Sequence, residues 1–138
     1  MKSFKEFISE ESKGINVRSD PKAGRSYADL IVDGKKKMET RDNDRALKSC
    51  IGKRVSIIKT GEGKAHAIGE VTVGEPQEVG EEEFRRRESE HLVPEKSDFD
   101  IKPGKTKHMY PMINPVRYDK PRRVAQYGMG IRKVFDEE

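Results

Sequence analysis

A glycine, two cations and a carboxylate lie close together in the sequence and have the residue types of a ligand site. Gly34, Lys36 and Arg41 follow the order G-x-K-x-x-x-x-R, and Glu39 stands between the two cations. An arginine and a lysine bind a phosphate or a planar polar ring through charge-assisted hydrogen bonds. A carboxylate beside them orients the arginine or accepts protons from the ligand. These residues therefore predict a polar binding site.

A short helix would precede this site and position its first residues. Its apolar face consists of three residues at helical spacing, Tyr27, Leu30 and Ile31. Ser26 or Asp29 can cap its first turn. Gly34 then ends the helix, because glycine readily adopts the left-handed backbone conformation that closes a helical turn.

A strand would carry the remaining residues of the site. Side chains alternate across a strand, so a strand that starts at Lys37 places Lys37, Glu39 and Arg41 on one face. Thr40 would point to the opposite face. Lys36 lies in the exit of the turn, from which its side chain reaches the face of Glu39 and Arg41. The alternative is a solvated strand face with ion pairs and no ligand.

The segment from Tyr27 to Asp42 resembles the signature of the ASCH domain, a family of small β-barrels related to the PUA RNA-binding modules. In residues 52–59 and 65–73, Val and Ile alternate with polar residues as in half-buried strands, and Gly61–Gly63 suits a hairpin loop between them. Residues 110–134 are similar to the closing section of the family. The resemblance implies an α+β fold, a small PUA-like β-barrel with two or three short helices. The ligand-binding residues that it implies are Tyr27, Gly34, Lys36, Glu39 and Arg41.

Some members of the family are amidohydrolases that remove the acyl group from N4-acetylcytidine. They use the motif lysine, a threonine three residues later and a glutamate from a later helix. Lys36 matches the lysine, Glu39 occupies the threonine position, and the helix glutamate would be Glu88 or Glu90. A carboxylate does not replace a hydroxyl nucleophile, although it can act as a general base for water. Lys36 and Glu39 would be the catalytic residues of such an enzyme. A ribonuclease activity also occurs in the broader family.

The composition fits one small domain at residues 11–138. The chain has 138 residues, of which 32% are hydrophobic and 39% charged, so its core must be thin. A closed barrel suits such a core, because closure leaves no sheet edge to protect. No apolar run approaches the length of a membrane span. Cys50 is the single cysteine, which excludes an intramolecular disulfide and fits a reducing, cytoplasmic location.

The chain is strongly basic from Ile101 to Phe135, and this segment contains Tyr110, Tyr118 and Tyr127. Such a composition is typical of a nucleic-acid surface, because phosphates attract cations and unpaired bases stack on aromatic rings. The residues predicted to contact a nucleic-acid backbone are Arg117, Lys120, Arg122 and Arg123. The alternative is a set of ordinary basic strands whose tyrosines pack inside the barrel.

Residues 81–92 are predicted to form one surface helix. Acidic residues occupy its first turn, Glu83 and Arg87 have the favourable i,i+4 order, and its apolar residues are chiefly Phe84 and Leu92. The polar segment 94–104 would follow as a loop that is mobile or becomes ordered on a ligand.

The first ten residues independently resemble the capsid-targeting leader of T4-type tailed phages. In that family the leader is removed after an apolar-x-Glu sequence, and the segment from Ile8 to Glu10 has this form. Phe4, Phe7 and Ile8 would form the apolar face of a docking helix. The resemblance implies the prohead and its protease as partners, and the virion head followed by the host cytoplasm as locations. The alternative is an N-terminal helix that packs on the barrel.

The sequence therefore predicts a module that binds RNA, another single-stranded nucleic acid or a modified nucleoside in a cavity floored by Lys36, Glu39 and Arg41. Two alternatives belong to other classes, an amidohydrolase acting on N4-acetylcytidine-like nucleosides and a phage decoy that binds a host protein. The three histidines show no metal-ligand spacing. The sequence thus predicts neither a metal nor a cofactor.

Overall fold

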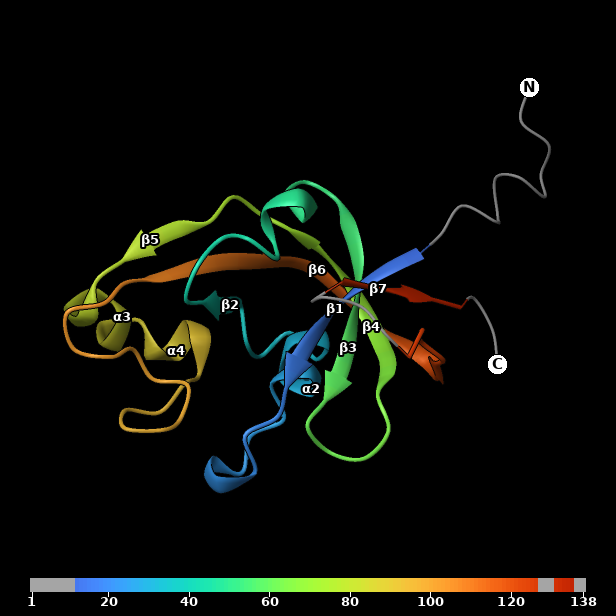
Figure 1. Cartoon of the computed structure of the whole chain (residues 1–138), viewed down its shortest axis with the longest axis horizontal. Coiled ribbons are helices and arrows are strands. Elements are labelled where there is room, and N and C mark those ends of the chain that lie inside the picture. Colours follow the sequence, from blue (N-terminus) through green and yellow to red (C-terminus); the bar gives the residue numbers. More distant parts are fainter. Residues whose placement is uncertain (1–11, 127–130, 136–138) are drawn as a thin grey trace.

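The computed structural model describes residues 12–126 and 131–135 (Figure 1). Its strands are β1 (Ser12–Arg18), β2 (Met38–Arg41), β3 (Arg54–Thr60), β4 (His66–Val73), β5 (Gln77–Val79), β6 (Lys107–Arg122) and β7 (Ile131–Val134). Its α-helices are α2 (Tyr27–Val32), α3 (Glu81–Arg86) and α4 (Glu88–His91), and two short 3-10 helices span Pro21–Ala23 and Lys48–Cys50. In these described ranges, no helix has both the length and the apolar character needed to cross a membrane. The predicted leader, with its processing site from Ile8 to Glu10, lies outside the described residues.

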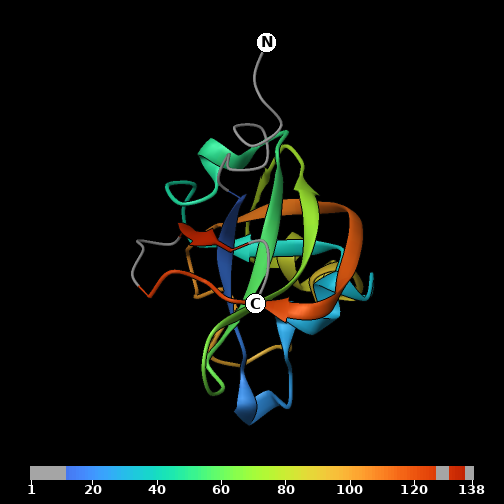
Figure 2. The same cartoon turned by 90° about the vertical axis from the view of Figure 1, so that its right-hand side faces the viewer.

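The strands form one mixed sheet that curls into a barrel-like shape, as the end-on view in Figure 2 shows. The strand order is β2-β6-β4-β3-β1-β7, and β5 also pairs with β6. β1 and β3 are parallel, whereas the other pairs are antiparallel. This arrangement, with its three short α-helices, confirms the predicted α+β class. The sheet is barrel-like rather than fully closed, because in the described ranges no backbone ladder joins β2 to β1. On its other side β7 bonds to the residues that follow β6, since the Ala125 N–H donates to the Lys133 carbonyl and the Phe135 N–H to the Arg123 carbonyl, both at 2.9 Å.

The long strand β6 organises the sheet. Its first half pairs with β2 and β5, and its second half pairs with β4, so it runs through most of the molecule (Figure 1). The register opposite β2 places Glu39 against Tyr110 and Arg41 against His108. The two predicted strands at 52–59 and 65–73 are present as β3 and β4. β6 therefore fixes the position of β2, which carries two of the predicted site residues.

The short helix before the site forms as predicted. Ser26 is its N-cap, and its Oγ accepts a hydrogen bond from the Asp29 backbone N–H at 3.4 Å. Tyr27 and Ile31 are buried, as are two residues that the predicted apolar face did not include, Ala28 and Val32. A helix of six residues has little stability alone, so this buried face against the sheet is what holds it.

The predicted surface helix at 81–92 is wrong in two respects. It is two helices, α3 and α4, with a break at Arg87, and it is partly buried. Phe84 and His91 are fully buried and stack with ring centroids 4.0 Å apart. The His91 Nδ1 accepts the Val93 backbone N–H at 2.9 Å, and its Nε2 donates to the Phe84 carbonyl at 2.6 Å. The break lets the His91 ring turn under Phe84, and periodicity alone gave no sign of this stack.

The loop after α4 is anchored by one buried carboxylate. Asp100 accepts hydrogen bonds from the backbone N–H groups of Lys96 and Ile101, both at 2.8 Å. It also accepts one from Arg85 of α3 at 3.0 Å. A carboxylate that satisfies several donors in this way orders a loop that lacks secondary structure. The neighbouring residue, Phe99, is thereby held against Tyr27.

We predict that Gly69→Ala destabilises the protein by about 1–3 kcal/mol, the usual effect of overpacking. A Cβ at Gly69 would lie 2.4 Å from the Val116 carbonyl oxygen and 2.6 Å from Cγ1 of Val32, so α2 would have to move away from the sheet. The measurement is denaturant unfolding followed by circular dichroism. Val116→Ala, at a position that is 50% exposed, is the control and should change stability by less than about 0.5 kcal/mol. Equal stability of Gly69→Ala and the wild type would contradict the close packing of α2.

Candidate functional site

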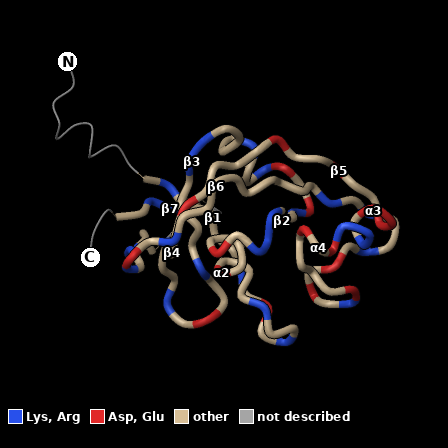
Figure 3. Tube along the Cα trace, turned by 180° about the vertical axis from the view of Figure 1, so that it is seen from behind, with Lys and Arg blue, Asp and Glu red and all other residues tan. Residues whose placement is uncertain are grey.

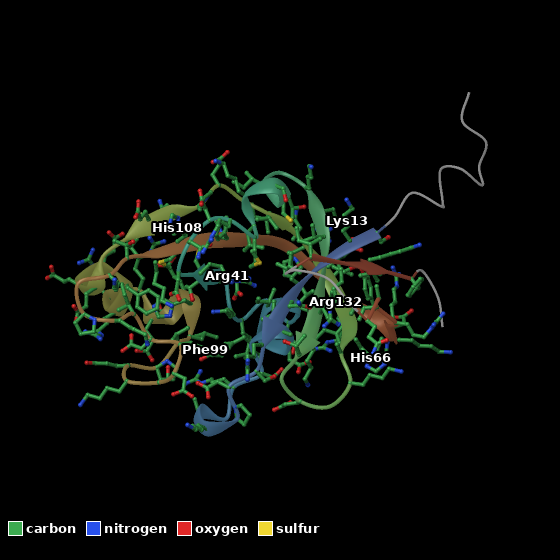
Figure 4. The ribbon with its side chains drawn as sticks, in the orientation of Figure 1. Lys13, Arg41, His66, Phe99, His108 and Arg132 are labelled. Carbon is green, nitrogen blue, oxygen red and sulfur yellow. The ribbon has the colours of Figure 1, made fainter. Side chains whose placement is uncertain are left out.

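A cavity of about 260 Å³ lies between β1, β2, the start of α2 and the loop that follows α4. Four of the five predicted ligand-binding residues line it, namely Tyr27, Lys36, Glu39 and Arg41. In Figure 4, Arg41 and Phe99 both lie in the region between α4 and β1. The structure therefore brings together side chains from four separate segments at the place where the sheet is not closed.

Lys36 is the most unusual residue of the cavity, because its side chain is only 1% exposed. Its ammonium group donates a hydrogen bond to the His91 carbonyl of α4 and lies 3.9 Å from Oε1 of Glu39. It also lies 4.7 Å from the centre of the Tyr27 ring. Burial lowers the pKa of Lys36 to about 8, although the Glu39 carboxylate acts in the opposite direction.

Glu39 and Arg41 form a tight ion pair beside Lys36. Arg41 Nε donates to Glu39 Oε2 at 2.9 Å, and Arg41 Nη2 lies 2.8 Å from the same oxygen. The Nη2 group also donates to the Asn16 carbonyl of β1 at 2.7 Å. Arg41 therefore spans the gap between β2 and β1 that no backbone ladder closes. The predicted trio of two cations and a carboxylate is assembled, with Glu39 between the cations.

Gly34 does not line the cavity and contributes through the backbone. Its φ of 80° is in the left-handed region. After it, the backbone N–H groups of Lys35 and Lys36 both donate to the Leu30 carbonyl, at 2.8 and 2.9 Å. The turn points the chain back under α2, which is how Lys36 becomes buried. Thr40, predicted to face away from the site, also contributes to the lining.

Two aromatic rings and two polar atoms complete the cavity. Tyr27 and Phe99 have ring centroids 5.7 Å apart, with planes inclined at 40°. The Tyr27 hydroxyl and the Asn16 side-chain carbonyl are buried and have no hydrogen-bond partner among the described residues. Burial and the nearby Asp20 raise the pKa of Tyr27 to about 12, so its hydroxyl remains a donor at neutral pH. Buried polar atoms normally have partners, so these two are unsatisfied groups in the wall of the cavity.

The four basic residues predicted to contact a nucleic-acid backbone do not line the cavity. Arg117 pairs with Asp29 and Asp33 at 2.9 and 3.0 Å. The Arg122 guanidinium lies 3.7 Å from the Tyr118 ring centre, and that of Arg123 lies 5.0 Å from the Phe135 ring centre. Lys120 is exposed. Figure 3 shows residues of both signs interspersed along the chain rather than one basic face. These four basic residues are close together in the sequence, but none of them lines the cavity.

One tyrosine of the basic segment is corrected by the structure. Tyr110 is fully buried in the core, so its ring cannot stack on a base at the surface. The Tyr118 hydroxyl is hydrogen-bonded with Ser56 at 2.6 Å and lies 3.1 Å from Glu70. Tyr127 is outside the described residues. The alternative of tyrosines that pack the barrel holds for Tyr110, because its strand position faces the interior.

Several residues of the cavity were not found from the sequence. Asn16 and Arg18 belong to β1, a strand that the sequence analysis did not identify, and Phe99 and Val93 come from the loop after α4. Lys107 also lines the cavity and pairs with Asp42 at 2.7 Å. One signal was available, since Phe99 is an isolated aromatic residue in an otherwise polar loop. The others depend on long-range strand pairing.

The helix glutamates considered for hydrolysis and the histidines considered for metal binding lie outside the cavity. Glu88 and Glu90 do not line the cavity, and both carboxylate oxygens of Glu90 accept hydrogen bonds from Arg87 at 2.9 Å. Among the described residues, no group of three or more His, Cys, Asp or Glu side chains is placed to hold a metal ion. Figure 4 shows His66 and His108 at opposite ends of the molecule. Burial lowers the pKa of His91 to about 4, so its ring is neutral at physiological pH.

The barrel-like sheet, its three short helices and the polar cavity at its open side define a small α+β domain. The family model of the ASCH domain matches residues 24–126, and the chain belongs to the ASCH domain family. The structure is similar to that of ASCH from Zymomonas mobilis, with a TM-score of 0.59 and 18% identity over 81% of this chain and 71% of that one. A tyrosine-to-phenylalanine variant of the Zymomonas mobilis protein gives a TM-score of 0.59, 18% identity and coverage of 81% and 73%. A serine-to-alanine variant of the same protein gives a TM-score of 0.53 and 23% identity, with coverage of 81% of this chain and 71% of that one. These likenesses show the fold, and no curated protein sequence matches the chain.

We predict that Lys36 titrates near pH 8 and that Glu39→Gln moves its midpoint lower, because removal of the carboxylate destabilises the charged ammonium. The folded chain then binds fewer protons than the unfolded chain between about pH 8 and 10.5, so this residue makes folding more favourable as the pH rises through that range. The measurement is an NMR titration of lysine side-chain signals, with the Lys36 signal assigned by its loss in Lys36→Met. Glu62→Gln, which removes a carboxylate near Lys59 instead, is the control. A wild-type midpoint at the ordinary lysine value would contradict the buried ammonium.

Proposed function

We propose that this ASCH domain binds single-stranded RNA and takes one nucleobase into the cavity. The observation that carries the proposal is the row formed by Lys36, Glu39 and Arg41 in the cavity wall. Charged groups are rarely buried unless they are paired or used for recognition. Here a carboxylate is held between two cations, so the wall offers hydrogen-bond donors and an acceptor side by side to a planar polar ring.

The aromatic residues suit the faces of a base. Phe99 is half-buried and lines the cavity beside the buried Tyr27, and stacking on an aromatic ring contributes about 1–3 kcal/mol per base. The cavity volume of about 260 Å³ is slightly below the usual range for drug-sized ligands and suits a ligand of one ring system. A base in a loop or a single strand can leave the stack and enter such a cavity, whereas a paired base cannot.

Two further cations lie close enough to the cavity to hold the phosphates that flank the base. Arg18 lines the cavity and is exposed, and Arg25 contributes positive charge at both Lys36 and Tyr27. Neither arginine has an ion pair within the described ranges. We assign the nearest phosphates to Arg18 and Arg25, and the more distant backbone to the exposed cations around Lys120. Arg18 and Arg25 are nearer to the cavity than Arg122 and Arg123, so we assign the phosphates next to the base to them.

We predict that Lys36→Met and Arg41→Ala each weaken the binding of a mixed-sequence RNA decamer by about tenfold or more, since each removes a charged group of the wall. Arg18→Ala should weaken binding less and reduce the dependence of log Kd on log salt concentration by about one unit, as expected for one lost phosphate contact. The measurement is fluorescence anisotropy with the full chain at two salt concentrations, repeated with single-stranded DNA.

The control is Lys48→Ala, an exposed lysine that does not line the cavity, and it should bind as the wild type does. Circular dichroism establishes that each variant is folded before its affinity is compared. Unchanged affinity of folded Lys36→Met and Arg41→Ala would refute the cavity as the binding site. Absence of RNA and DNA binding by the wild type would refute the function itself and favour the protein-binding alternative.

A second function is supported by one observation, the lowered pKa of Lys36 beside a carboxylate. Such a pair can transfer protons near neutral pH, as hydrolysis of an acylated nucleoside such as N4-acetylcytidine requires. Glu39 would act as the general base for water, because the family threonine is absent at its position. If the chain is this amidohydrolase, Glu39→Gln abolishes acetate release from N4-acetylcytidine and Glu88→Gln does not, because only Glu39 lines the cavity. Wild-type protein that releases no acetate would exclude this function.

The prediction of a phage leader rests on residues 1–10, and that of a decoy rests on the pattern of charges in the sequence. The described residues add no contact in favour of either one. We therefore place nucleobase binding first, because it uses groups that the fold brings together.

A further inference from the structure

We propose that the base taken into the cavity is uracil, recognised through its imide edge. This inference rests on the proposed function, because it names the base that the RNA-binding site selects. The edge consists of a carbonyl, the N3–H group and a second carbonyl. Its order of acceptor, donor and acceptor is the complement of the row formed by Lys36, Glu39 and Arg41.

The hydrogen bonds already made within the row determine what it can still offer. The Lys36 ammonium donates to the His91 carbonyl, and its other N–H groups make no hydrogen bond to the described residues. Arg41 uses Nε and Nη2 toward Glu39 and Asn16, and its Nη1 donates no hydrogen bond to the described residues. Glu39 Oε2 accepts from Arg41, whereas its Oε1 accepts no hydrogen bond within the same ranges. The free groups are therefore a donor, an acceptor and a donor, in that order.

The four RNA bases present different edges to such a row. Uracil places N3–H opposite the Glu39 carboxylate and a carbonyl opposite each cation. Cytosine and adenine place an unprotonated ring nitrogen opposite the carboxylate, so two acceptors face each other. Guanine has a ring N–H for Glu39 and a carbonyl for one cation, but its amino group meets the other cation. A buried group that loses its partner is costly, so the order of affinity should be uracil, guanine, and then adenine and cytosine.

The remaining walls are compatible with a pyrimidine. Tyr27 and Phe99 are the aromatic residues of the lining, and their rings are inclined rather than parallel. The Tyr27 hydroxyl and the Asn16 side-chain carbonyl are buried, polar and without partners among the described residues. The row of Lys36, Glu39 and Arg41 therefore decides the base.

Modified nucleotides test the proposal on the wild-type chain, without relying on the folding of a variant. The probes are RNA pentamers of uridine, cytidine, adenosine and guanosine, measured by anisotropy competition. A uridine pentamer with 3-methyluridine at every position has lost N3–H and should bind at least about tenfold more weakly. A pentamer of 5-methyluridine carries the same extra methyl group away from the imide edge and is the matched control. It should bind within about threefold of uridine.

Glu39→Gln supplies the second test, because an amide has both a donor and an acceptor. The substitution keeps the shape of the side chain and allows its N–H group to face the ring nitrogen of cytosine. The preference for uridine over cytidine should fall by about tenfold or more. Glu62→Gln, which neutralises an exposed carboxylate that does not line the cavity, should keep the wild-type preference.

The outcomes separate this inference from the proposed function. Weak binding of the 3-methyluridine pentamer together with retained binding of the 5-methyluridine pentamer supports recognition of uracil. Equal affinity for uridine and 3-methyluridine overturns it. RNA binding that still requires Lys36 and Arg41 but favours another base also overturns it, while the proposed function stands. If no pentamer and no decamer binds, both fail.

Discussion

The burial of one ammonium group is the constraint on which the rest of this structure depends. A lysine side chain that is 1% exposed has lost its hydration, and that loss is costly unless other groups replace water. The fold supplies a carbonyl at the end of α4, a carboxylate from β2 and the face of the Tyr27 ring from α2. Three elements must therefore meet at one point, and their meeting forms the inner wall of the cavity.

The same constraint explains why α3 and α4 are broken rather than continuous. The carbonyl that accepts the Lys36 hydrogen bond belongs to His91, whose ring is stacked on Phe84 and hydrogen-bonded through both nitrogens. A single straight helix through Arg87 would carry that carbonyl elsewhere. The backbone N–H of Lys37 also donates to the Glu90 carbonyl at 2.8 Å, which fixes α4 against the start of β2. The helical break thus belongs to the site, although none of its side chains touches the cavity.

The sequence could predict the interactions between residues that are close together in the chain, but not those between residues that are far apart in it. The turn at Gly34, the cap at Ser26 and the trio of Lys36, Glu39 and Arg41 are local, so propensity and alternation were enough to predict them. The stack of Phe84 on His91 and the participation of β1 depend on partners far away in the chain. The partners of basic residues such as Arg117 could not be foreseen for the same reason, because that arginine pairs with Asp29 of α2 and with Asp33 just after the helix. Membership of the ASCH family adds the fold, and the details of the cavity come from this chain.

The bridge that Arg41 makes from β2 to β1 has a consequence for how this domain can diversify. Adjacent strands in a ladder are held about 4.8 Å apart whatever their residues are. Arg41 replaces that fixed spacing with the reach of a guanidinium on a flexible stem. The gap between β2 and β1 can therefore widen or narrow when residue 41 is substituted, while the sheet keeps its register and its core. A barrel-like sheet whose two strands are bridged by a side chain can therefore evolve toward ligands of different size without a change of fold.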